Sequence, residues 1–77
     1  MTMRELRRER VVAGVSGRLL CARAQVDRAR LSAIERGYFE PTASEMERLE
    51  QALSDLIRAK QKVAEVAAEA GWPLDAV

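Results

Sequence analysis

The side chains with the clearest chemistry in this sequence are the arginines of its first half. Residues 1–40 contain nine arginines and five acidic residues, whereas residues 41–77 contain four basic and seven acidic residues. A guanidinium group is a planar fork of donors that matches phosphate oxygens and the edge of guanine. The split charge, +4 against −3, indicates that one half faces a polyanion and that the other half has a different task. An ordinary solvated surface with an arginine-rich composition is the alternative.

Residues that would support other chemistry are scarce. The 77 residues include no histidine and one cysteine, Cys21. The sequence therefore lacks the commonest general base and metal ligand, and it has no second cysteine for an internal disulfide. We expect a binding protein without enzymatic activity, metal or cofactor. We expect Cys21 to be a small buried residue, and a redox switch is the alternative.

The length and the composition favour one small globular domain. The chain of 8.6 kDa is 48% hydrophobic and 32% charged, which is too apolar for a disordered tail. It has no apolar run of roughly 18 residues, the length that a membrane-spanning helix needs. Charge follows soon after Met1, unlike the start of a signal peptide. We therefore expect a cytoplasmic, nucleoid-associated protein with no membrane partner.

The elements that must position the arginines are all expected to be helices. Thr2 followed by Glu5 has the spacing of a capping box and predicts a first helix that ends near Gly14. Ser16 has the side chain of an N-cap residue and predicts a second, short helix. Arg10 falls on the same face of the first helix as the apolar residues Met3 and Leu6, so we expect it to be mostly buried.

A third helix is predicted after Asp27, another N-cap residue. It carries Leu31 and Ile34 and ends at Gly37, in a position that favours the left-handed conformation. Pro41 prevents this helix from continuing. Leu31 and Ile34 are three residues apart and should face the core, so the opposite face of the helix presents Arg28, Ala29, Ser32 and Ala33.

A long helix is predicted from the second capping box, Thr42 and Glu45, up to about residue 70. Residues at alternating steps of three and four form a heptad seam that is apolar except at Lys60: Met46, Leu49, Leu53, Leu56, Lys60, Val63, Ala67 and Ala70. A helix of this length extends beyond a domain of this size, so its outer half needs a partner. Self-association is our interpretation; a helix that bends at Ser54-Asp55 and folds back on its own domain is the alternative.

We therefore divide the chain into residues 1–53, a binding domain, and residues 54–77, a helical extension for dimerisation. The expected dimer contacts come from the seam and from the aromatic residue that follows it: Leu49, Leu53, Leu56, Lys60, Val63, Ala67 and Trp72. Lys60 interrupts the apolar seam, and would either fix the register of pairing or weaken it. Trp72 would cover the end of the helix or contact a partner subunit.

Residues 4–53 resemble the phage-repressor and Cro-like helix-turn-helix family, often called XRE-type. The run from Val26 to Gly37, with its end Ile34-Glu35-Arg36-Gly37, is similar to the family's recognition helix and terminating glycine. The resemblance implies an all-α, repressor-like helix-turn-helix domain of four to five helices with a long C-terminal helix. Two positions depart from the family: Gly17 replaces its usual Gln, and Gln25 replaces its usual turn Gly, which favours a positive φ.

The resemblance also implies roles for individual residues. The exposed face of the third helix would meet base edges in the major groove: Arg28, Ala29, Ser32 and Ala33. Phosphates would be held at the starts of the second and third helices and along the flank, by Ser16, Gly17, Arg18, Arg30, Arg36 and Tyr38. For Arg30 and Arg36, a solvated surface role is the alternative. The family has an ion pair at the positions of Arg10 and Glu35, which implies that these two side chains meet.

The function implied is sequence-specific binding of double-stranded DNA by a transcriptional regulator that acts as a repressor and binds an inverted repeat as a homodimer. A phage repressor, an antitoxin-type autoregulator and a restriction controller all fit this description. A regulatory protein is a further candidate partner. The alternative function is a protein-interaction module, of antitoxin or adaptor type, that reuses the helix-turn-helix fold.

Overall fold

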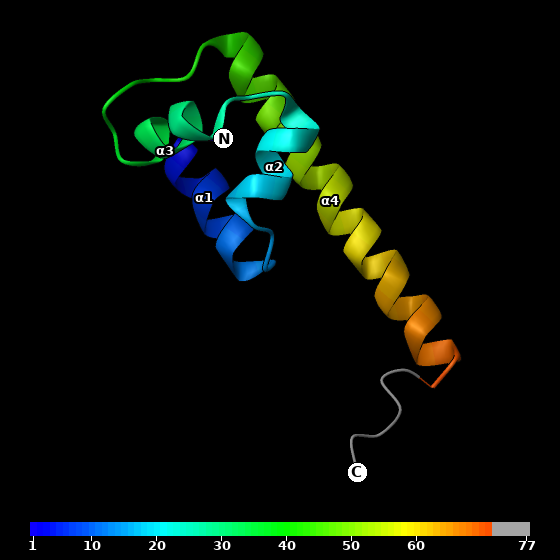
Figure 1. Cartoon of the computed structure of the whole chain (residues 1–77). Helices are drawn as coiled ribbons and strands as arrows, with labels where there is room; N and C mark the ends of the chain where they lie inside the picture. The colour runs from blue at the N-terminus through cyan, green and yellow to red at the C-terminus, as the bar shows by residue number, and fades with distance from the viewer. Residues whose placement is uncertain (72–77) are drawn as a thin grey trace.

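The computed structural model describes residues 1–71, and these form four α-helices and no strand (Figure 1). In chain order, the helices are α1 (Met3–Val12), α2 (Gly17–Ala24), α3 (Arg28–Glu35) and α4 (Ala43–Glu69). The predicted all-α architecture with a long C-terminal helix is confirmed. None of the helices within residues 1–71 has the length and apolarity needed to cross a membrane. Trp72 lies outside the described residues, so its predicted role in dimerisation stays a prediction.

Each helix begins at the capping residue that the sequence predicts. The side chains of Thr2, Ser16, Asp27 and Thr42 accept hydrogen bonds from backbone N–H groups of the first helical turn, at 2.9–3.2 Å. Thr42 and Glu45 form a complete capping box, because the Glu45 carboxylate also accepts the backbone N–H of Thr42 at 2.9 Å. These bonds satisfy N–H groups that have no partner within the helix.

The turn between α2 and α3 is built around Gln25, which adopts a left-handed conformation with φ 57° and ψ 48°. Its backbone oxygen accepts a hydrogen bond from Nη1 of Arg48 on α4, at 3.2 Å. A residue with a Cβ atom is strained in this conformation, by roughly 1–2 kcal/mol. The turn therefore has the left-handed conformation that favours glycine, and Gln25 adopts it with strain.

The core lies where α1 and α2 pack against the first half of α4, with α3 packed on α1 and α2. It is formed by buried apolar side chains from all four helices and the two loops between the first three: Leu6, Val15, Leu20, Cys21, Ala24, Val26, Leu31, Ile34, Leu49, Ala52 and Leu53. Cys21 is the small buried residue that the sequence predicts. Burial raises the pKa of its thiol, which disfavours the reactive thiolate.

Two residues of the predicted dimer seam belong to this core instead. Leu49 is 0% exposed and Leu53 is 2% exposed within a single chain, so neither side chain is free to contact a second copy. The prediction that Leu49 and Leu53 mediate dimerisation is wrong. The heptad spacing is real, but its first half packs on α1 and α2 of the same chain.

The second half of α4 leaves the domain without a bend. The helix is continuous from Ala43 to Glu69, through Ser54 and Asp55 and across the predicted boundary at residue 53. Figure 1 shows this half projecting past α1–α3. Its main polar anchor is Lys60, whose Nζ donates to the backbone oxygens of Ala13 at 2.8 Å and Gly14 at 3.3 Å. The ammonium therefore caps the C-terminal end of α1, while the predicted effect of Lys60 on pairing, to fix its register or to weaken it, stays a prediction.

Replacing Gln25 by glycine should stabilise the fold. Glycine adopts the left-handed conformation without a steric penalty, and the backbone bond to Arg48 is retained. After allowance for the extra freedom of glycine in the unfolded chain, we expect Gln25→Gly to raise the free energy of unfolding by about 0.5–1 kcal/mol. Chemical denaturation measures this change. Gln25→Ala is the control and should match the wild type; a glycine variant less stable than the wild type would contradict the assignment of strain.

Candidate nucleic-acid interface

The residues that hold the candidate interface together are Arg10 and Glu35, which the structure brings into a bidentate pair. Arg10 Nε donates to Glu35 Oε2 and Arg10 Nη2 donates to Glu35 Oε1, both at 3.1 Å. Arg10 Nη1 donates to the backbone oxygen of Val15, at 3.0 Å. One guanidinium therefore joins α1 to the end of α3 and to the loop that enters α2.

This pair is largely shielded from water. The side chains of Arg10 and Glu35 are 14% and 12% exposed. When a buried pair of this kind loses one partner, the remaining charge is left without compensation, at a cost of roughly 3–5 kcal/mol. The geometry thus gives Arg10 a positioning role within the domain, although it counts toward the basic half of the sequence.

The outward face of α3 carries the four residues expected to meet base edges. Leu31 and Ile34 are 2% and 3% exposed and fix the inward face of the helix. On the other side of the helix, Arg28 and Ala29 are exposed and Ser32 and Ala33 are partly exposed. Arg28 is the first residue of α3 and makes no salt bridge within residues 1–71. The guanidinium is therefore available to a ligand.

The start of α2 packs close to α3. Ser16 and Arg18 are exposed, and Gly17 is partly exposed. A Cβ atom added at Gly17 would lie 3.9 Å from Leu31 Cδ2 and 4.0 Å from the guanidinium carbon of Arg10, which are ordinary van der Waals distances. Gly17 is therefore adjacent to α3 and to the Arg10–Glu35 pair, and its lack of a side chain does not distort the start of α2.

Arg36 and Tyr38, at the C-terminal end of α3, are both exposed, and Tyr38 is 71% exposed. Like Arg18 and Arg28, Arg36 is exposed and makes no salt bridge within the described part of the chain. These three come from the start of α2 and from the two ends of α3. The arrangement is a basic surface around an outward-facing helix, which attracts a polyanion.

Arg30 is not part of that free basic surface. Its Nε donates to Glu45 Oε2 at 3.0 Å, and its Nη2 donates to Glu45 Oε1 at 2.9 Å. The same guanidinium lies over the ring of Phe39, 5.5 Å from the ring centroid, within the range of a cation–π interaction. The donor fork of Arg30 links α3 to α4, and the predicted phosphate contact of Arg30 stays a prediction.

Sequence reasoning missed this pair because its partners are fifteen residues apart. Glu45 was predicted only as the capping residue of α4, yet its Oε1 atom accepts both from Thr42 N and from Arg30 Nη2, each at 2.9 Å. The hydrogen bonds from Arg30 and then from Thr42 lower the pKa of Glu45 from 4.5 to about 2. The one feature of the sequence that pointed to this pair was the position of Arg30, on the side of α3 opposite Arg28.

Comparison with known families gives one match. Residues 4–54 match a helix-turn-helix family model. Neither the curated proteins nor the solved structures gave a match. The matched range includes α1, α2 and α3 and the first half of α4, and it therefore contains every residue of the candidate interface.

The pair between Arg30 and Glu45 predicts how stability depends on pH. Because the pKa of Glu45 is lowered on folding, its contribution is present above pH about 4.5 and is lost as the pH falls towards about 2. We expect Glu45→Gln to be less stable than the wild type at pH 7, and to lose less stability across this window. Denaturation at a series of pH values measures both effects. Glu47→Gln, an exposed neighbour on α4, is the control; identical pH profiles for Glu45→Gln and the wild type would refute the assignment.

Proposed function

This chain belongs to the XRE-type helix-turn-helix family of DNA-binding regulators, and from that premise we propose that it is a sequence-specific repressor. In this proposal it binds an inverted repeat as a homodimer, with α3 of each copy in the major groove. The observation that carries the proposal is the outward face of α3, where Arg28 is exposed and free of any salt bridge in the described residues.

Base recognition is assigned to the exposed residues of α3. Arg28 stands at the start of the helix, where it would donate two hydrogen bonds to O6 and N7 of one guanine. Ser32 has a hydroxyl group that donates or accepts, and the small side chains Ala29 and Ala33 permit close approach or contact a thymine methyl group. In this assignment, Arg28 discriminates strongly between bases, and the other three residues make supporting contacts.

Phosphate contacts are assigned to the flanks of the same face. Arg18 and the first backbone amides of α2, at Ser16 and Gly17, lie on one side. Arg36 and Tyr38 lie at the other end of α3. Contacts of this kind place α3 on the duplex and carry most of the affinity but little sequence information.

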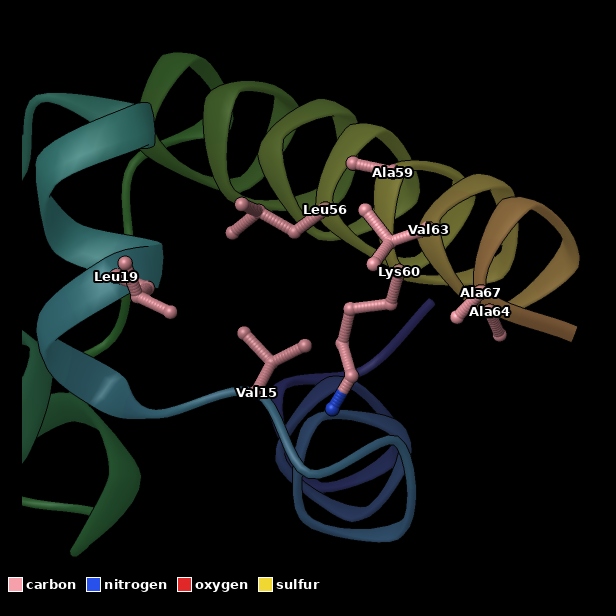
Figure 2. Close-up of a pocket in the computed structure, with 8 residues that line it drawn as sticks. All are labelled: Val15, Leu19, Leu56, Ala59, Lys60, Val63, Ala64 and Ala67. Atoms are coloured by element: carbon pink, nitrogen blue, oxygen red, sulfur yellow. The ribbon is translucent and has the colours of Figure 1, made fainter. Parts of the chain in front are cut away.

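A single recognition helix contacts too few base pairs to act alone. We therefore propose that a second copy of the chain binds to the projecting half of α4. A groove of about 600 Å³ runs along this half, opposite Val15 and Leu19 (Figure 2). The seam residues Leu56, Val63 and Ala67 line it from α4, and the side chains of Leu19 and Val63 are 55% and 67% exposed. Since Leu49 and Leu53 are buried in the core of their own chain, the proposed dimer interface starts at Leu56.

In the dimer, the two α3 helices would lie about 34 Å apart, on successive turns of one face of the duplex. The projecting half of α4 would set this separation. The alternative function, a protein-interaction module, uses the same groove for a helix of another protein. A chain that stays monomeric while binding no duplex would favour that alternative.

Replacing Arg28 by alanine tests the base contact. We first define the operator by selection from random duplexes, then compare the dissociation constants for that operator and for an unrelated duplex. Loss of one bidentate contact to guanine should reduce the ratio of the two constants roughly tenfold to hundredfold. Arg58→Ala on the exposed side of α4 is the matched control and should keep the ratio. If Arg28→Ala keeps the preference for the operator, Arg28 makes no base contact.

Replacing Val63 by glutamate tests the dimer. Light scattering should give the wild type a mass twice the 8.6 kDa of one chain. A carboxylate buried in the seam would have to lose its hydration, so Val63→Glu should weaken association by roughly a hundredfold or more and give the monomer mass. The adjacent variant Lys62→Glu, on the charged side of α4, should remain dimeric. An unchanged mass for Val63→Glu would exclude this face as the interface.

A further inference from the structure

The first helix sorts its charges onto two sides. Arg4, Arg7 and Arg8 are exposed and follow one another at steps of three and one, so they share one side of α1. Glu5 and Glu9 lie on another side of α1 and line a different surface depression next to Ile57, which Arg8 also borders. Arginines three and four residues apart on a helix repel one another in the free protein. An anionic ligand on this side would relieve that repulsion.

The arginine side of α1 borders a groove that reaches the end of α3. The groove has a volume of about 630 Å³ and is lined by Arg4, Arg7 and Arg8 from α1 together with Arg36 and Glu35 from α3. Val11 and Val12 line its other end. Four arginines thus converge on one concave surface, and Arg36 is at the same time the last arginine of the outward face of α3.

The one carboxylate in this groove does not neutralise it. Both oxygens of Glu35 already accept hydrogen bonds from Arg10 at 3.1 Å. Arg7 Nε is 3.9 Å from Glu35 Oε1, which is beyond hydrogen-bond distance, and the Arg7 side chain is 57% exposed. Arg4, Arg8 and Arg36 make no salt bridge within the described residues. The groove therefore keeps most of its positive charge.

We infer that Arg4, Arg7 and Arg8 form a second phosphate-binding strip, which continues from Arg36 and holds the DNA backbone beside the groove that α3 enters. This inference rests on the proposed function, because it places the duplex against α3. Phosphodiester is favoured over an acidic peptide, since the strip joins the outward face of α3 through Arg36 and consists of guanidinium groups, which match phosphate oxygens in pairs. The strip contacts no base edge and so adds affinity without sequence preference.

The test is the variant Arg4→Gln/Arg8→Gln, measured for binding to the operator and to an unrelated duplex over a range of salt concentrations. We expect binding to both duplexes to weaken by the same factor, so that the preference for the operator is kept. The slope of log affinity against log salt should become shallower by about two for each bound chain, and thus by about four for the homodimer. Arg58→Gln/Lys62→Gln removes the same charge at the same spacing from the exposed side of α4, and it should keep the wild-type slope.

Circular dichroism should show that both double variants fold, since all four side chains are exposed. If the wild type binds duplex and Arg4→Gln/Arg8→Gln has the same salt slope as the wild type, the phosphate-binding strip is rejected and the proposed function stands. A wild type that binds no duplex overturns both. A fluorescent oligoglutamate peptide is the second probe: if Arg4→Gln/Arg8→Gln abolishes its binding while keeping the DNA slope, the groove is a site for acidic protein and the phosphate strip is rejected.

Discussion

The arrangement of the molecule depends on the partly buried guanidinium of Arg10. It binds both oxygens of Glu35 on α3 and the backbone oxygen of Val15 before α2, so three segments are fixed by one side chain. The start of α2 and the whole of α3 must keep a fixed relative orientation. Only then can the backbone amides of α2 and the side chains of α3 contact the same duplex. A charge pair with directional hydrogen bonds holds this relation more specifically than apolar contacts, which tolerate sliding.

Two groups among the arginines of the first half therefore have different tasks. Arg10 and Arg30 are used inside the domain, each with both donors of its fork on one carboxylate. Arg18, Arg28 and Arg36 remain exposed and without a carboxylate partner in residues 1–71. Net charge alone does not separate the groups, because an arginine held by a glutamate counts as much as a free one. The basic surface around α3 is consequently smaller than the composition suggests.

The sequence was sufficient for features whose partners are close along the chain. The caps at Thr2, Ser16 and Asp27 bind backbone groups two or three residues away, so the local pattern determines them. The contacts of Arg30 and Lys60 were missed because their acceptors lie fifteen and about 46 residues away and depend on how α4 packs. The sequence predicts the heptad seam of α4, but a repeat of apolar residues does not show whether it packs against the same chain or against a partner. Leu49 is covered by its own chain, whereas Val63 is left exposed.

The central claim is that the surface made by the start of α2 and the outward face of α3 binds duplex DNA. Titration of the isotope-labelled protein with a short operator duplex, followed through its backbone amide resonances, tests this claim most directly. The account predicts that the largest shifts fall within residues 16–18 and 28–38, while residues 59–69 of the projecting half of α4 change little. Shifts concentrated along that half of α4, with α2 and α3 unaffected, would contradict it.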